Sequence, residues 1–137
     1  MIKLRCSFSV STKSIPKVHD YVRKSLCTCN IAEGTLDDIV LASDEIATNI
    51  VEHAYKLPCN ASNFSLSMRV TPEKIVVTFF DHGESFDLTK VPSPNIGQNL
   101  AGHTKGGFGI FLIRRLMDKM IYSAREKLNI TRIVKEL

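Results

Sequence analysis

The sequence predicts an α+β fold, a two-layer α/β sandwich with a mostly antiparallel sheet and helices on one face. Two observations predict it. Segments in which apolar and polar residues alternate, as in strands with one buried face, occur in groups rather than one after each helix. Between these groups lie segments whose apolar residues recur every three or four positions, as in helices with one buried side. The 137 residues suit a single domain over 1–137.

The first half of the chain carries one predicted strand and two predicted helices. Apolar residues alternate with polar ones over residues 4–10, which predicts a strand. Ser14 followed by Pro16 is typical of a helix start, and the apolar spacing continues that helix to Leu26. A second apolar stripe predicts a helix over 35–56.

The second half carries two strands, a long loop, a third helix and two more strands, which we place at 64–70, 75–80, 83–106, 107–118, 120–125 and 129–136. Pro72 presets the turn between the first two strands. The loop is rich in Gly, Pro, Ser and Asn and shows no period. Structureless loops of this length are uncommon inside compact domains and are often functional, so we interpret it as a lid.

Composition argues against several classes of protein. The net charge is only +4 and the basic residues are scattered, so we expect no nucleic-acid partner. No apolar run approaches the roughly 20 residues that cross a bilayer, and the N-terminus lacks a signal-peptide core, so we expect no membrane and a cytoplasmic protein. Cys27 and Cys29 have no matching second pair, which favours reduced thiols over a zinc site.

The first cluster of candidate site residues lies on the second predicted helix. Glu45 and Asn49 are four residues apart and therefore share one side of the helix, away from its apolar stripe. A carboxylate can orient or deprotonate a hydroxyl group, and an asparagine carbonyl is a suitable ligand for Mg²⁺. The alternative is an ordinary solvated helix face.

The second cluster ends an apolar strand, in the stretch FFDHGESFD over residues 79–87. Asp81 can accept a hydrogen bond from an amino group such as that of adenine. Gly83 lets a flat ring approach the backbone because it has no side chain. The alternative is a common turn built on Asp and Gly.

The third cluster is the run GHTKGGFG, which precedes the third predicted helix. Gly107 and Gly109 leave backbone N–H groups accessible at a helix start, where the helix dipole favours a phosphate, and Lys105 adds a positive charge. The run is not a Walker A loop, since no Gly-Lys-Ser/Thr follows. The alternative is a flexible loop that meets a helix.

The three clusters occur in the order found in the GHKL superfamily, whose ATP-binding domain is the Bergerat fold. The stretches DEIATNIVEHAY, FDHGESFD and GGFGIFLIRRLMDKM resemble its N, G1 and G2 boxes. Within the superfamily, the chain looks most like the bacterial anti-sigma-factor serine/threonine-protein kinases, whose N box typically ends in His-Ala-Tyr, here His53-Ala54-Tyr55.

The resemblance implies a role for each candidate residue. Glu45 would be the catalytic carboxylate and Asn49 a ligand of Mg²⁺. Nucleotide-binding roles would fall to Asn49, Asp81, Gly83, Lys105, Gly107, Gly109 and Thr131. Among these, Asp81 would bind the adenine amine, and Thr131 would lie near the same ring.

The resemblance also implies a reaction and partners. Mg-ATP would phosphorylate a serine of an anti-anti-sigma protein, a STAS domain, and this would free the chain to bind a sigma factor. The resemblance also implies a homodimer. Two alternatives stay open. One is a non-catalytic, ATP-dependent binding module of the same partner-switching system. The other is the catalytic domain of a histidine kinase, which shares the nucleotide boxes.

Overall fold

The computed structural model describes residues 1–56, 63–85, 87–90 and 108–137. In chain order the elements are β1 (Ile2–Ser9), α1 (Ser14–Leu26), α2 (Glu33–Lys56), β2 (Asn63–Val70), β3 (Lys74–Asp81), the 3-10 turn η1 (Leu88–Lys90), α4 (Phe108–Leu116), β4 (Lys119–Arg125) and β5 (Leu128–Glu136). This order confirms the predicted one. Within the described ranges, no helix is long and apolar enough to cross a membrane.

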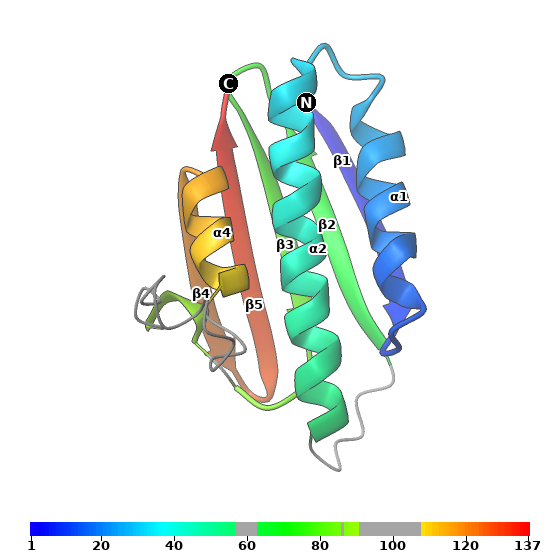
Figure 1. Cartoon of the computed structure of the whole chain (residues 1–137), viewed down its shortest axis with the longest axis vertical. Helices are drawn as coiled ribbons and strands as arrows, with labels where there is room; N and C mark the ends of the chain where they lie inside the picture. The colour runs from blue at the N-terminus through cyan, green and yellow to red at the C-terminus, as the bar shows by residue number, and fades with distance from the viewer. Residues whose placement is uncertain (57–62, 86, 91–107) are drawn as a thin grey trace.

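The five strands form one sheet in the order β1-β2-β3-β5-β4, and every neighbouring pair is antiparallel. Helices α1, α2 and α4 all lie on the same face of this sheet (Figure 1). The predicted α+β sandwich with helices on one face is therefore confirmed. β5 lies between β3 and β4, which brings the end of β3 beside the start of β5.

The core lies between the sheet and the helices. Alternate residues of β2 and β3 point toward the helices, and Leu66, Val77 and Phe79 are completely buried there. Val22 of α1 and Ile46 of α2 are buried on the opposite side of the same layer. Burial of one such side chain contributes about 1.5–3 kcal/mol to stability, so this layer fixes α2 firmly against the end of the sheet.

The predicted structureless loop contains one ordered turn, η1. Its start is fixed by Asp87, whose carboxylate accepts hydrogen bonds from the backbone N–H and the hydroxyl of Thr89. Arg114 of α4 donates to the carbonyl oxygens of Leu88 and Thr89 at 3.2 and 3.0 Å. Leu88 is consequently held against the body of the domain and is only 4% exposed. Most of the predicted lid, 91–106, lies outside the described residues, as does Gly107 at the start of the predicted third helix.

Candidate functional site

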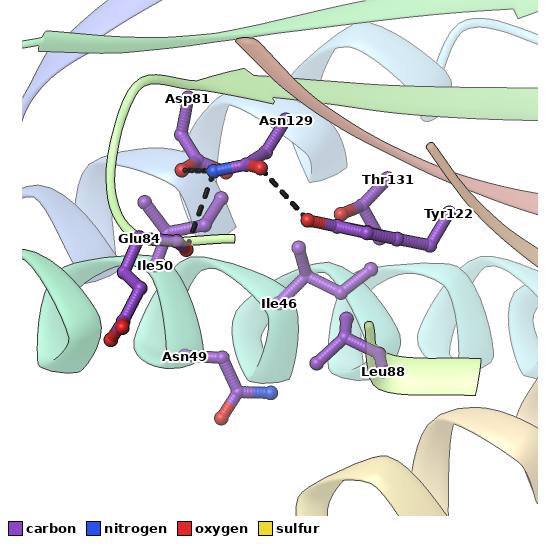
Figure 2. Close-up of a pocket in the computed structure, with 9 residues that line it drawn as sticks. All are labelled: Ile46, Asn49, Ile50, Asp81, Glu84, Leu88, Tyr122, Asn129 and Thr131. Atoms are coloured by element: carbon purple, nitrogen blue, oxygen red, sulfur yellow. Dashed lines mark hydrogen bonds between the residues drawn. The ribbon is translucent and has the colours of Figure 1, made fainter. Parts of the chain in front are cut away.

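A small hollow lies where the end of β3, the start of β5 and the middle of α2 meet (Figure 2). Its lining combines apolar and polar side chains and comprises Ile46, Asn49, Ile50, Asp81, Glu84, Leu88, Tyr122, Asn129 and Thr131. Three predicted site residues, Asn49, Asp81 and Thr131, thus lie around one hollow although they are far apart in the sequence.

Asp81 lies at the inner end of the hollow and is 9% exposed. Its Oδ1 accepts hydrogen bonds from the backbone N–H of Gly83 at 3.0 Å and from the side-chain amide of Asn129 at 2.9 Å. A Cβ added to Gly83 would lie 3.3 Å from the same oxygen, so glycine lets the turn close tightly on the carboxylate. No described residue donates to the other oxygen, Oδ2, which leaves an acceptor for a ligand.

Asn129 is a site residue that the sequence reasoning missed. It is 2% exposed and pairs directly with Asp81 across β3 and β5. Besides Asp81, its amide donates to the carbonyl oxygen of Gly83 at 2.9 Å, and its own oxygen accepts from the hydroxyl of Tyr122 at 2.8 Å. Asn129 therefore fixes both the Asp81 carboxylate and the turn that follows β3.

Thr131 lies two residues further along β5 and also points into the helix-facing layer, where it is 3% exposed. The sheet register places it between Phe79 of β3 and Tyr122 of β4. A hydroxyl on this wall can donate or accept a hydrogen bond at the edge of a planar ring. The inner part of the hollow thus offers a carboxylate, an amide and two hydroxyl groups among aliphatic side chains.

Asn49 projects from α2 at the outer rim of the hollow, near Glu84 and Leu88 and away from the Asp81–Asn129 pair (Figure 2). Its amide nitrogen is buried and has no hydrogen-bond partner within the described residues. A buried polar group without a partner costs free energy, and a ligand that accepts its hydrogen bond would remove that cost. Asn49 is therefore placed to hold a group that enters from the rim.

Glu45 lies one helical turn before Asn49, beside the start of α4. A Cβ added to Gly109 would come into hard contact with the Glu45 carboxylate, because even the carboxyl carbon would be only 3.3 Å away. The glycine therefore permits α2 and α4 to approach each other at this point. The predicted first and third clusters meet here, although Lys105 and Gly107 lie outside the described residues.

The environment of Glu45 makes its carboxylate more basic. Burial raises the pKa of Glu45 above its ordinary value, and the negative charges of Asp44 and then Glu52 raise it further. A carboxylate with a raised pKa accepts a proton more readily than an exposed one. The raised pKa of Glu45 is of the kind that a general base requires.

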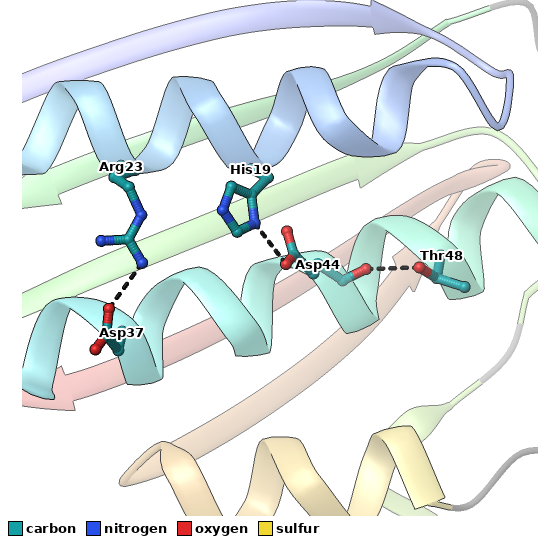
Figure 3. Close-up of polar contacts among 5 residues, drawn as sticks. All are labelled: His19, Arg23, Asp37, Asp44 and Thr48. Atoms are coloured by element: carbon teal, nitrogen blue, oxygen red, sulfur yellow. Dashed lines mark hydrogen bonds and ion pairs between the residues drawn. The ribbon is translucent and has the colours of Figure 1, made fainter.

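Asp44, next to Glu45, connects α2 to α1. Its Oδ2 lies 2.8 Å from Nδ1 of His19, and a second ion pair, Arg23 with Asp37 at 2.7 Å, joins the same two helices (Figure 3). Burial raises the pKa of Asp44, an effect that the contact with His19 partly offsets. These contacts fix the position of the helix that carries Glu45 and Asn49.

The oxygen donors at the rim of the hollow are of a kind that can hold a magnesium ion. No group of three His, Cys, Asp or Glu side chains converges anywhere in the part of the chain that the structure describes. Mg²⁺ does not need such a group, because it binds through one or two protein oxygens together with substrate phosphates and water. The amide oxygen of Asn49, at the rim and near Glu45, is of the required kind.

Comparison with known proteins identifies what this arrangement is similar to. Residues 8–135 match the family described as the histidine kinase-like ATPase domain. Serine-protein kinase RsbW of Staphylococcus epidermidis is 34% identical over 89 residues, which are 62% of this chain and 56% of the relative. The Staphylococcus aureus protein of the same name is 33% identical over the same share. The chain thus spans about half the length of the curated relatives it matches.

Solved structures share the fold. The RsbU and RsbW domains of a Mycobacterium tuberculosis protein superpose with a TM-score of 0.71 at 13% identity, over 98% of this chain and 32% of that one. The SiaB-SiaC complex from Pseudomonas aeruginosa gives 0.69 at 14% identity, over 98% of this chain and 88% of that one. At these identities the likeness concerns the fold alone.

Proposed function

Because the chain belongs to the histidine kinase-like ATPase domain family, we propose that it binds Mg-ATP and transfers the γ-phosphoryl group to a serine of an anti-anti-sigma STAS-domain protein. The observation that supports this most is the convergence of Asp81, Asn49 and Glu45. From the inner end of the hollow to the start of α4, Asp81 is the acceptor for adenine, Asn49 the ligand for magnesium and Glu45 the general base.

The inner end of the hollow accounts for a preference for adenine over guanine. Oδ2 of Asp81 accepts a hydrogen bond from the exocyclic amine of adenine, while Asn129 holds Oδ1. Guanine carries a carbonyl oxygen at the corresponding position, which a carboxylate repels. Ile46 and Ile50 supply the apolar surface against which a flat ring packs.

The outer part of the hollow accounts for the triphosphate. The N-terminus of α4 begins at Phe108, and its free backbone N–H groups and positive dipole end favour phosphate oxygens. Asn49 would supply an oxygen ligand for the magnesium ion, and the bound ion would neutralise charge on the phosphates. Lys105 and Gly107 belong to the same proposal as phosphate-binding residues.

Glu45 completes the chemistry as general base. It accepts the proton of the substrate serine hydroxyl while the serine oxygen forms a bond to the γ-phosphorus. The bond between the γ-phosphorus and the β,γ-bridging oxygen breaks, and ADP leaves with the electron pair. Phosphoryl transfer needs little covalent help from a protein, so a positioned triphosphate and one base suffice.

The proposed partners follow from the family and from the names of the relatives. The matched relatives are serine-protein kinases, and one structural neighbour was solved as a complex of two proteins. We infer that the chain, as a homodimer, binds either a sigma factor or the STAS-domain protein, and that phosphorylation of the latter switches the partner.

The test of this proposal is transfer of radiolabelled γ-phosphate from Mg-ATP to candidate STAS proteins of the source genome. The expected result is a labelled serine in one of them, identified by mass spectrometry. Tight binding of Mg-ATP without labelling of any candidate would instead support the non-catalytic binding module. Absence of nucleotide binding would contradict both readings.

A further inference from the structure

The face of the sheet turned away from the helices carries a concentration of positive charge. Paired residues of neighbouring strands point to the same side, so the register assigns side chains to this outer face. Besides Lys74, which lies opposite the acidic Glu136, six exposed basic residues lie on it: Lys3, Arg5, Arg69, Lys119, Arg125 and Arg132. The whole chain has a net charge of only +4, so the rest of the surface is close to neutral or negative.

These charges are not neutralised within the described residues. None of the six lies in an ion pair; the pairs that form involve His19, Arg23 and Lys135 on the helix side. The strand residues of the outer face include one acidic residue, Glu136. The register places it opposite a further basic residue, Lys74. A partner that covers this face must therefore bring negative charge.

The middle of the outer face is mostly apolar, with Thr78 and Arg132 at its centre. Val76 and Phe80 of β3, Ile130 of β5 and Ile121 of β4 are all partly exposed there, and Ile121 is 47% exposed. Arg5 lies over the Phe80 ring, 4.9 Å from its centre, and Arg132 donates to Thr78 between the apolar positions. The basic residues of β1 and β2 border this stripe on one side. On the edge strand β4, Lys119 and Arg125 lie before and after Ile121, and Arg132 of β5 lies within the stripe.

We propose that the outer face docks an amphipathic α-helix of a partner protein, with an apolar strip down its middle and acidic residues on both flanks. The spacing of the apolar residues on the outer face is similar to the length of a short helical segment. Val76 and Phe80 are four residues apart on one strand, or about 13 Å, and seven residues of a helix span about 11 Å. A helix on this face would turn the two layers into three, with the sheet in the middle, which is a common architecture.

Three other occupants agree less well with these side chains. A second copy of the chain would place like charges against each other. Single-stranded nucleic acid binds through several exposed aromatic rings, whereas this face has one, Phe80, which Arg5 already covers. A membrane favours protruding apolar groups, but here the apolar side chains lie between longer charged ones.

The test uses a synthetic helical peptide of Leu, Ala and Glu, with leucines at positions i, i+3, i+4 and i+7. Binding to the folded chain is measured by fluorescence anisotropy and mapped by amide chemical shifts. We expect shifts at Val76, Phe80 and Ile130. The triple variant Arg5→Glu, Arg69→Glu, Arg132→Glu should bind at least about tenfold more weakly, and raised salt should weaken the wild type.

Two controls keep the test specific. The variant Lys13→Glu, Lys17→Glu, Lys24→Glu reverses as many exposed charges on the helix side and should keep its affinity. A scrambled peptide of equal charge should bind more weakly than the amphipathic one. Circular dichroism verifies the fold of each variant, and Val76→Ser with Ile121→Ser provides a second, uncharged test of the stripe.

Several results would overturn the proposal. Equal affinity for the scrambled peptide, equal loss in the helix-side variant, or shifts confined to the helix layer would each do so. Tighter binding of a single-stranded oligonucleotide or of phosphatidylglycerol vesicles would assign the face to another occupant. Self-association that disappears in the triple variant would assign it to a second copy of the chain.

Discussion

The amide nitrogen of Asn129 lies 2.9 Å from Oδ1 of Asp81, and the two residues are direct partners across β3 and β5. This contact leaves Oδ2 as the Asp81 oxygen available to a nucleobase, and it holds the carboxylate in one orientation. Tyr122 in turn holds the Asn129 side chain. In the proposed function, recognition of adenine would therefore depend on a residue that does not itself need to touch the nucleotide.

Substitution Asn129→Leu should weaken Mg-ATP binding by about tenfold, because Asp81 loses a donor and can rotate. It should also reduce the preference for ATP over GTP, which a purely structural role would not change. Titration calorimetry with both nucleotides measures the two effects. Tyr122→Phe removes one hydroxyl and should give a smaller change in the same direction; unchanged selectivity in Asn129→Leu would refute the positioning role.

Substitution Asp81→Asn should weaken Mg-ATP binding by about 10- to 100-fold, the usual range for losing a hydrogen bond to a charged group. The loss should be specific to adenine nucleotides, and the melting temperature should change little because the amide keeps the same size. Fluorescent-nucleotide displacement provides the measurement. If ATP affinity were unaltered, Asp81 would be an ordinary end of a strand.

Substitution Glu45→Gln should lower the rate of phosphoryl transfer by about 10²- to 10⁴-fold, the range expected for loss of a general base. Nucleotide affinity should stay within about twofold, since Glu45 does not line the inner hollow. Single-turnover transfer and equilibrium binding separate the two quantities. A matched exposed control on the same helix is Glu52→Gln, which should keep most of the activity.

The transfer rate should also depend on pH in a defined direction. A base must be deprotonated, so activity is present above the pKa of Glu45 and is lost as pH falls through it. Burial, then Asp44 and Glu52, raise this pKa above the ordinary 4.5, so the loss should begin at a higher pH than for an exposed glutamate. Glu52→Gln should shift the acidic limb to lower pH; a shift to higher pH would contradict the assignment.

Substitution Gly109→Ala should impair transfer, because the added methyl group meets the Glu45 carboxylate and must displace it. Glu45 is a flexible side chain, so the fold should persist with a small change in melting temperature. In a Glu45→Ala background the same change should cost little more, which a double-mutant cycle measures. Independent, additive losses would show that the two residues do not act together.

The sequence was sufficient to predict the order of elements, and three of the candidate residues that it named, Asn49, Asp81 and Thr131, line one hollow. Periodicity identified the strands and helices, since each has one buried face. Periodicity could not identify Asn129, because the start of β5 reverses the usual pattern of apolar residues inward and polar residues outward. Asn129 and Thr131 point inward, whereas the apolar Ile130 points outward. The polar residues are inward because they line a hollow, which no periodicity reveals. Leu88 escaped because a turn as short as η1 has no period.

The most direct measurement of the central claim is a titration of the isotopically labelled chain with Mg-ATP, followed by amide chemical shifts. We predict the largest shifts at Gly83, Asn129 and Thr131 and at the first residues of α4, with GTP producing much smaller ones. Shifts that leave these positions unchanged, or that GTP reproduces equally well, would contradict it.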